Sequence, residues 1–313
     1  MHAASSPAWV NFPVCGMNRT RIQIAKADIV KHFDQLPSHV LKLNEIRAIL
    51  ADQRTFWRLA QNTTAADFIA FLRQHAKLKE IAFPFPQRSE QAYVWGDVPL
   101  LTVLLSLRKN LYLSHYTAMR LHGLTEQSPK TIYTTDERSS GSGSQQERPK
   151  LSQNDIDQAF THAPRVSHNW VEYAGKRIYL LNGAHTGHLG VVAERVTDDG
   201  GEEVLARLTN LERTLIDIVV RPIYAGGIFE VAKAFELAKG SVSINKLVAT
   251  LRKLDFAYPY HQAIGYYLER AGYKPTQIDL IRRLPIEYDF YLMHEMGETR
   301  YVKEWRLFVP NGF

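Results

Sequence analysis

The chain contains a single cysteine, Cys15, among its 313 residues. One cysteine excludes an intrachain disulfide and a zinc site built on paired cysteines, and it fits a reducing cytoplasm. The longest apolar run, "VPLLTVLLSL" (98–107), is far shorter than the ~20 residues that cross a bilayer, and it predicts a buried helix. The first residues lack the basic and apolar regions of a secretion signal, and Met17 is an alternative start to Met1. We therefore expect a cytoplasmic protein with no membrane partner.

The common catalytic signatures are missing as well. There is no GxSxG, no Walker loop and no GxGxxG. The stretch "HEMGE" from His294 is half of a zinc-protease helix, but Glu298 occupies the position of the second histidine, so we interpret it as a polar turn. His185 and His188 have no cysteine or carboxylate near them in the sequence. We expect no catalytic residue, no metal and no cofactor, and no enzymatic activity.

The basic excess of the chain is confined to its first part. The sequence has 38 Lys and Arg against 32 Asp and Glu, a net charge of +6. Residues 1–88 contain 12 basic and 6 acidic residues, which leaves 26 of each for the remainder. A basic segment joined to a neutral body is typical of a module that binds a polyanion, most commonly nucleic acid. A mildly basic domain without that role stays the alternative.

The order of elements in residues 25–96 predicts a winged helix-turn-helix. Apolar residues at helical spacing predict helices over 25–36, 43–60 with Asn44 as N-cap, and 64–78, with the short strand "HVLKL" between the first two. Thr64 and Asp67 have capping-box spacing at the third helix. "KEIAF" and "AYVWG" predict strands joined by the basic loop "PFPQRSEQ". Such a module suits the DNA major groove, although helical triplets with a hairpin also bind proteins.

The third helix is the expected DNA-reading element. Base contacts are expected near its start, and phosphate contacts from arginines and lysines around it. Thr64 serving only as a cap, and Arg73 serving only as a solvated residue, are the alternatives. The predicted DNA-binding residues are Arg54, Arg58, Asn62, Thr63, Thr64, Asp67, Arg73, Lys77 and Arg88.

Residues 97–313 predict a larger mixed α/β domain, so the expected class is α+β. Ser114 can cap the helix "HYTAMRLH", and Gly123 can end it in a left-handed turn. "KTIYTT" and "HNWVEYAGKRIYLLNG" predict strands, and a Gly/Ser run predicts a flexible loop over 136–150. A block of helices follows in "LTNLERTLIDIVVRP", where Thr209 and Glu212 have capping-box spacing, "IFEVAKAFELAKG", "INKLVATLRKL" and "YHQAIGYYLERAG". The tail segments "IEYDFYLM" and "RYVKEWRLFVP" predict a closing hairpin.

Three segments in this order resemble the AbiEi family, the antitoxin and transcriptional regulator of AbiE type IV toxin-antitoxin systems. They are "LSHYTAMRLHGLTEQSPKTIYTT", "LTNLERTLIDIVVRPIYAGGIFEVAKAF" and "AIGYYLERAG". The resemblance spans nearly the whole chain. It implies an N-terminal winged-helix domain (25–96, after an extension over 1–24) that binds inverted repeats in the operon's own promoter, and a C-terminal antitoxin domain (97–313). It also implies a genetic partner, an AbiEii-like nucleotidyltransferase toxin, with which no stable complex forms.

Two carboxylate clusters leave a catalytic alternative open. Glu212, Arg213 and Asp217 crowd one helix start, where an ion pair that fixes the helix is the preferred interpretation over a catalytic pair. Asp289 with Lys303 and Glu304 is the nearest approach to a magnesium-dependent nuclease site. A nuclease, or a DNA-binding regulator without a toxin, is the alternative to an autorepressor and antitoxin.

Overall fold

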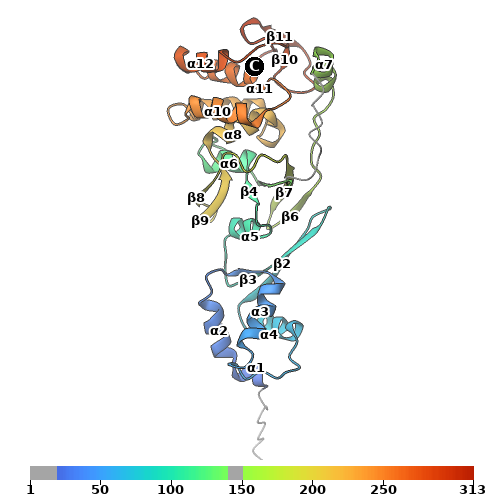
Figure 1. Ribbon diagram of the computed structural model, residues 1–313, viewed down its shortest axis with the longest axis vertical. Helices are drawn as coiled ribbons and strands as arrows, with labels where there is room; N and C mark the ends of the chain where they lie inside the picture. Colours follow the sequence, from blue (N-terminus) through green and yellow to red (C-terminus); the bar gives the residue numbers. More distant parts are fainter. Residues whose placement is uncertain (1–19, 140–150) are drawn as a thin grey trace, which may run out of the picture. The chain divides into compact units, whose positions relative to one another are not determined.

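The computed structural model describes residues 20–139 and 151–313, so the predicted extension over 1–24 and the predicted loop over 136–150 lie mostly outside the described residues. Helices and sheets are both present, as the α+β prediction requires (Figure 1). The chain divides into two compact units. Unit 1 holds the described residues up to Glu80 together with Tyr93–Gly96, and unit 2 holds Ile81–Ala92 and Asp97–Phe313.

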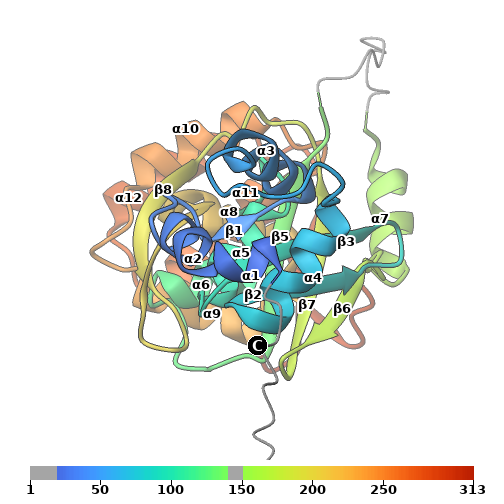
Figure 2. The ribbon, with the colours of Figure 1, turned by 90° about the horizontal axis from the view of Figure 1, so that it is seen from below.

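Unit 1 is a group of helices around a short sheet. Its elements are α1 (Arg21–Ile24), α2 (Lys26–Asp34), β1 (Val40–Leu41), α3 (Leu43–Gln53), α4 (Ala65–His75) and the inner ends of β2 (Leu78–Pro84) and β3 (Ser89–Trp95). The sheet has the order β1-β3-β2, with β1 antiparallel to β3. In Figure 2 the helices surround β1. Stacked and tilted rings of Phe33, Trp57, Phe68 and Trp95 fill the core.

Helix α3 is shorter than predicted. It ends at Gln53 rather than near residue 60, and it begins at Leu43, so Asn44 lies inside the helix and Lys42 takes the N-cap position. Trp57 is nevertheless buried, with 3% of its surface exposed. The chain turns after α3 through a left-handed Arg58 (φ 53°) and brings the indole back into the core. The apolar spacing that predicted a longer helix therefore reflects a turn that returns Trp57 to the core.

Unit 2 contains a six-stranded mixed sheet of order β6-β7-β5-β4-β9-β8. Its strands are β4 (Tyr112–Leu113), β5 (Thr131–Glu137), β6 (Trp170–Tyr173), β7 (Lys176–Gly183), β8 (Val191–Thr197) and β9 (Glu203–Thr209). The β5–β7 and β4–β9 pairs are parallel and the other pairs are antiparallel. Because β5 and β7 run in the same direction, their carboxyl ends meet at one edge of the sheet.

All helices of unit 2 except the first share an apolar core that is separate from the core of unit 1. The helices of unit 2 are α5 (Leu100–Ser106), α6 (His115–Leu121), α7 (Gln153–Thr161), α8 (Leu211–Val220), α9 (Ile228–Leu237), α10 (Ile244–Leu254), α11 (Tyr260–Arg270) and α12 (Pro275–Arg282). Figure 1 shows α8, α10 and α12 stacked in succession away from the sheet. Residues 212–219 of α8 are all buried, because the helix lies between the sheet and the other helices.

The chain end differs from the predicted hairpin. A three-stranded sheet of order β10-β12-β11 forms from β10 (Phe290–Tyr291), β11 (Thr299–Val302) and β12 (Leu307–Pro310). The hairpin joins β11 to β12 within "RYVKEWRLFVP", whereas β10 pairs with β12 in parallel. Within the described ranges, no helix combines the length and the apolar character that a bilayer crossing requires.

Candidate functional site

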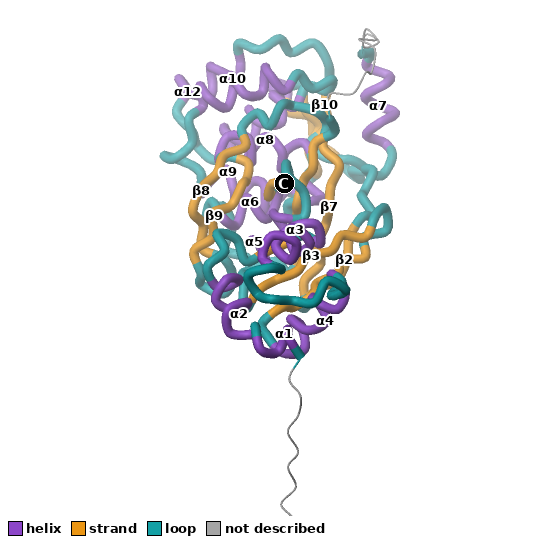
Figure 3. Tube along the Cα trace, turned by 60° about the horizontal axis from the view of Figure 1, so that its bottom comes forward, coloured by secondary structure: helices purple, strands orange, loops and turns teal. Residues whose placement is uncertain are grey.

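Helix α4 has one apolar face and one exposed polar face. Phe68 and Leu72 are fully buried. On the other side, Ala66, Ala70 and Gln74 are exposed at spacings of four residues, which forms a narrow stripe along one helix face. Figure 3 shows α4 together with α1 and α2 in unit 1. The small side chains of Ala66 and Ala70 would let another molecule approach the helix backbone closely.

The capping box predicted for this helix is confirmed. The Thr64 hydroxyl accepts a hydrogen bond from the Asp67 amide at 3.1 Å and donates to the Asp67 carboxylate at 2.6 Å. The Asp67 carboxylate also accepts from the Thr64 amide at 3.1 Å. These hydrogen bonds from Thr64 hold the pKa of Asp67 below its ordinary value. Both side chains are therefore committed to starting the helix.

Replacing Thr64 by alanine is expected to lower the free energy of unfolding by about 1 kcal/mol, because the amide of Asp67 loses its cap. Thr64→Ser keeps the hydroxyl and is the matched control, for which we expect a loss of no more than a few tenths of a kcal/mol. Urea unfolding followed by circular dichroism measures both. Equal losses in the two variants would contradict the capping role.

Arg54 holds the connection between α3 and α4. Its guanidinium donates to the carbonyl oxygen of Ala60 at 2.6 Å and to that of Thr63 at 2.9 Å. The predicted phosphate contact by Arg54 has to compete with these internal bonds. Asn62 is exposed and Thr63 is half-buried, and Arg54 fixes the loop that carries them.

Two more of the predicted cationic contacts are paired within unit 1. Lys77 donates to the Asp34 carboxylate at 2.8 Å, and the Trp95 indole donates to the same carboxylate at 2.6 Å. The hydrogen bond from Lys77, followed by that from Trp95, lowers the pKa of Asp34. Arg73 forms an ion pair with Glu80. Sequence spacing could not reveal the Asp34–Lys77 pair, because Asp34 ends α2 and Lys77 lies 43 residues later, between α4 and β2.

A groove next to the loop after α3 contains two arginines with no internal partner. It has a volume of about 690 Å³ and is lined by Arg21, Ile24, Ala25, Asp28, Phe56, Trp57 and Arg58. Among the described residues, neither guanidinium forms a hydrogen bond or an ion pair. The buried indole nitrogen of Trp57 also has no acceptor within the described part of the chain. Phe56 is 72% exposed beside these donors. Sequence reasoning identified Arg58 but missed Arg21 and Trp57, which only the fold places beside it.

Arg88 lies at the tip of the β2–β3 hairpin, in the part that belongs to unit 2. Its side chain is 77% exposed and approaches Glu90 at 3.9 Å. The neighbouring Gln87 accepts a hydrogen bond from Asn182 at 3.1 Å, and its amide donates to Asn169 at 3.4 Å. The base of the tip is thus anchored within unit 2 while Arg88 stays in solvent. Its contact with phosphate stays a prediction.

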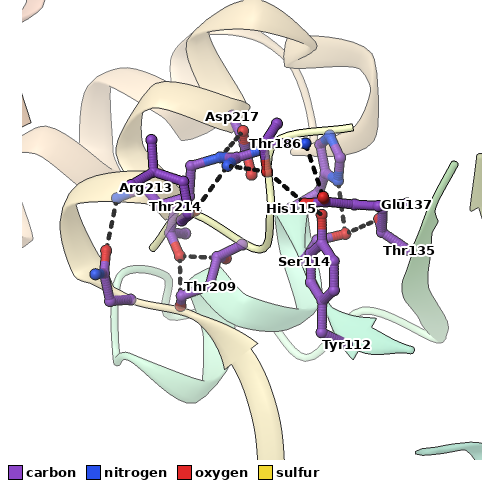
Figure 4. A network of polar contacts seen from close by, with 12 residues as sticks. Tyr112, Ser114, His115, Thr135, Glu137, Thr186, Thr209, Arg213, Thr214 and Asp217 are labelled. Carbon is purple, nitrogen blue, oxygen red and sulfur yellow. Dashed lines mark hydrogen bonds and ion pairs between the residues drawn. The ribbon is translucent and has the colours of Figure 1, made fainter. Parts of the chain in front are cut away.

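Two of the three segments that carry the family resemblance, the one from Leu113 and the one from Leu208, converge on one polar site in unit 2 (Figure 4). Ser114 occupies the N-cap position of α6, but its hydroxyl makes no capping bond. It lies instead 2.7 Å from the Thr135 hydroxyl and 2.8 Å from His115 Nδ1. The predicted capping hydrogen bond of Ser114 is therefore wrong, because the hydroxyl contacts Thr135 on β5 instead. Gly123 has φ 68° and ends the helix, as predicted.

Helix α8 supplies the charged residues of the polar site. Arg213 donates through Nε to Asp217 at 2.7 Å and through a terminal nitrogen to the carbonyl of Leu189 at 2.8 Å. Both side chains of this pair are over 90% buried. The pair confirms the preferred interpretation of "ERTLID" as an ion pair that fixes the helix. Gly190 leaves room for it, since a Cβ there would lie 2.7 Å from that of Arg213.

The N-terminus of α8 is capped differently from the prediction. Asn210, not Thr209, is the N-cap, and its side chain accepts from the Arg213 amide at 2.9 Å. Glu212 faces α10, where it accepts from the Ser243 amide at 3.1 Å and pairs with Lys246 at 2.9 Å. The capping-box spacing at Thr209 and Glu212 was thus misleading, because tertiary contacts use the carboxylate.

A pocket of about 390 Å³ opens beside these residues. Its wall includes Thr135 at the end of β5, Gly183 at the end of β7 and the loop that follows. The adjoining Glu137 accepts hydrogen bonds from the Thr186 amide at 2.8 Å and from the His188 amide at 3.1 Å. Although burial acts to raise the pKa of Glu137, the bonds from Thr186 and His188 lower it overall. The carboxyl ends of parallel strands are where ligands commonly bind in mixed sheets.

His115 has an unusual backbone for its residue type. It is the first residue of α6 and has φ 49°, in the left-handed region that few non-glycine residues adopt. Burial lowers the pKa of its imidazole to about 4, and the nearby Arg213 and Arg221 act in the same direction while Asp217 opposes them. The ring is therefore neutral at pH 7. Strained residues of this kind concentrate at functional sites.

Lowering the pH from 7 to 5 is expected to remove about 2 kcal/mol of stability through His115. An unfolded imidazole protonates near pH 6.5, whereas the folded one resists protonation until about pH 4. The unfolded state thus binds more protons in this window, so the stabilisation is complete above pH 6.5 and is lost as the pH falls. The His115→Asn variant tolerates the left-handed backbone and cannot titrate. Chemical unfolding at both pH values should show a smaller loss for that variant; equal losses would rule His115 out.

The predicted nuclease residues do not form an open carboxylate site. Asp289 accepts hydrogen bonds from Tyr301 at 2.5 Å and from Arg306 at 2.8 Å. Its pKa is lowered, first by the bond from Arg306 and also by the bond from Tyr301. In the described part of the chain, no three His, Cys, Asp or Glu residues gather in a way that could hold a metal ion. The nuclease alternative gains no support from Asp289.

Comparison with known proteins gives a structural neighbour. The chain is similar in fold to the RV2827C protein from Mycobacterium tuberculosis, with a TM-score of 0.55, 14% sequence identity and coverage of 91% of each chain. At this identity the likeness concerns the fold alone. No protein-family model and no curated protein matches the sequence. The function therefore has to be argued from the residues of the chain itself.

Proposed function

We propose that this chain is a cytoplasmic, double-stranded DNA-binding repressor of its own promoter, acting through a winged helix-turn-helix in residues 25–96. The observations that carry the proposal are the exposed stripe of α4 and, in the same unit, two arginines that have no partner among the described residues. In this reading α3 and α4 form the helix-turn-helix and β2 and β3 form the wing. The inverted repeats expected in the promoter follow from the resemblance to the AbiEi family.

The stripe of Ala66, Ala70 and Gln74 suits insertion into the major groove. Small side chains bring the helix backbone close to base edges, and alanine methyl groups can contact the thymine methyl. Gln74 can form a bidentate pair with adenine. Asn62 and Thr63 lie just before the helix, in a loop that Arg54 holds in place. Base readout by α4 would therefore use side chains that are not already engaged in contacts within unit 1.

Phosphate contacts are best assigned to Arg58 and Arg21. Both guanidiniums line the groove, and neither has an acceptor among the described residues. Phosphate oxygens accept from arginine, and such contacts position a protein on the duplex without reading its sequence. Arg54, Arg73 and Lys77, which are bonded internally, take supporting roles in this proposal. Arg88 is the wing contact.

The antitoxin function is the second part of the proposal. It rests on the resemblance to the AbiEi family, which assigns antitoxicity to the C-terminal domain and an AbiEii-like nucleotidyltransferase as the toxin. Co-expression with a toxin of that class encoded beside this gene should restore growth without a complex that survives gel filtration. Continued growth arrest in the presence of this chain would leave a DNA-binding regulator without an antitoxin role.

Fluorescence anisotropy with DNA from upstream of the gene, and with a shuffled duplex, tests the DNA-binding function. We expect selective binding that persists at physiological salt. Arg58→Ala should weaken binding to both duplexes and reduce the slope of log K against log salt by about 0.9, the value of one phosphate contact. Gln74→Ala should instead reduce the difference between the duplexes, by about 1 to 3 kcal/mol.

Lys31→Ala is the matched control, since it removes one positive charge from an exposed position on α2 outside the groove. Its effect on the salt slope should be smaller than that of Arg58→Ala. Equal, weak and salt-labile binding of the unmodified chain to both duplexes would overturn the proposed function. If Arg58→Ala left the salt slope unchanged and binding stayed selective, only the assignment of phosphate contacts to the groove would be wrong.

A further inference from the structure

The pocket beside α8 lies outside the proposed DNA interface and has the features of a ligand site. It is built wholly from unit 2, where the ends of β5 and β7, the α8 helix and the segment between α10 and α11 meet. Polar residues line one part, including Thr135 and His115. Val220, Leu254 and Phe256 line another part. A small number of polar groups against an apolar wall is the usual composition of a small-molecule site.

Two arginines and two aspartates line the pocket, and they differ in their contacts. Arg213 and Asp217 neutralise each other through their 2.7 Å ion pair. Arg221, the residue after α8, also lines the pocket and is partly buried. Its guanidinium forms no hydrogen bond or ion pair with any described residue. Asp255 is the other lining carboxylate, and it has an interaction of its own. A partly buried guanidinium without an acceptor favours an anion.

Thr135, His115 and Gly183 line the same pocket as Arg221. Gly183 packs directly against Thr135, since a Cβ there would lie 2.9 Å from the Thr135 methyl carbon. The Thr135 hydroxyl is held by Ser114, which in turn lies beside His115 Nδ1. The neutral His115 ring adds no positive charge of its own to the pocket. A ligand that brings negative charge would be stabilised by Arg221 and would favour protonation of the His115 ring.

We propose that this pocket binds a small oxyanion, a phosphate or carboxylate group of a metabolite, with Arg221 as its charged donor and Thr135 as a hydroxyl donor. The pocket volume of about 390 Å³ admits a small molecule around that group. The oxyanion would lie at the carboxyl ends of the parallel strands β5 and β7. The apolar wall of Val220, Leu254 and Phe256 would contact the rest of the ligand.

Isothermal titration of the full chain with inorganic phosphate, and separately with acetate, tests the inference against sodium chloride at equal ionic strength. We expect saturable binding of at least one of the two, and the stronger probe identifies phosphate or carboxylate as the preferred group. Arg221→Gln should raise the apparent Kd at least tenfold. Arg221 also lines a second cavity of about 320 Å³, so its variant does not distinguish the two sites. Thr135 lines only the pocket of about 390 Å³, and Thr135→Val should weaken binding there alone.

Lys253→Gln is the charge-matched control, because it removes an exposed cation of α10 that does not line the pocket. It should bind as the unmodified chain does. The His115 Cε1 proton resonance provides a second readout, since a bound anion next to the ring should shift it and raise its pKa. No saturable binding of either probe, or equal binding by Arg221→Gln with an unmoved His115 resonance, would overturn the inference. Neither result bears on DNA binding by unit 1.

Discussion

Replacing Gly265 by alanine is expected to lower the free energy of unfolding by about 3 kcal/mol or more. A Cβ at this position of α11 would overlap the ring of Trp305. The indole is fully buried, and its nitrogen donates to Glu269 at 2.6 Å, so the ring cannot move aside without losing that bond. Urea unfolding at pH 7 measures the loss, which should appear as a lower midpoint or as failure to fold.

Gly297→Ala is the matched control. Its new methyl group would meet nothing within 4 Å, and its backbone is not in the left-handed region. The change should alter stability by no more than about 0.5 kcal/mol. The clash also predicts coupling: Trp305→Phe should cost less in the presence of Gly265→Ala than alone, because the smaller ring relieves the overlap. Additive losses from the two changes would contradict the proposed packing of Gly265 against Trp305.

Replacing Asp217 by asparagine is expected to cost about 3 to 5 kcal/mol. The change keeps the size of the side chain but removes the charge that compensates Arg213, whose guanidinium is buried between α8 and the loop before β8. A buried cation without its partner is far more costly than the pair is favourable. Thermal and chemical unfolding should both show the loss.

An exposed ion pair of unit 2 serves as the control for Asp217. Arg195 and Glu203 lie 3.6 Å apart on β8 and β9, with 79% and 71% of their side chains exposed. Glu203→Gln should change stability by less than about 1 kcal/mol, because solvent screens the pair. Similar losses for Asp217→Asn and Glu203→Gln would show that burial of Arg213 does not set the energetics of this pair.

Local signals in the sequence predicted several elements correctly. Helix α4 begins at the predicted Thr64–Asp67 capping box, and the apolar run over 98–107 contains the buried helix α5. Both depend on contacts between residues a few positions apart, which spacing reveals. Helix α7 was missed, although Ser152 and Asp155 form a capping box at its start. Strands β8 and β9 were missed too, because charged residues interrupt their apolar pattern.

The partners of polar side chains could not be predicted in the same way. Thr209 and Glu212 have the spacing of a capping box, yet Glu212 contacts Ser243 and Lys246, more than 30 residues further along the chain. The same holds for Ser114, whose hydroxyl contacts Thr135 on β5. Spacing identifies which side chains can bond locally, but a distant partner brought close by the fold can take precedence.

The sequence by itself determined the class of the fold, the position of most helices and the concentration of positive charge in the first 88 residues. These properties follow from periodicity, local caps and composition, which act over a few residues or need no geometry at all. Only the tertiary structure decided which cations are free. Arg54, Arg73 and Lys77 are bonded within unit 1, whereas Arg21, Arg58 and Arg221 have no partner among the described residues. The physical reason is that pairing depends on distances across the fold, and one-dimensional spacing does not contain those distances.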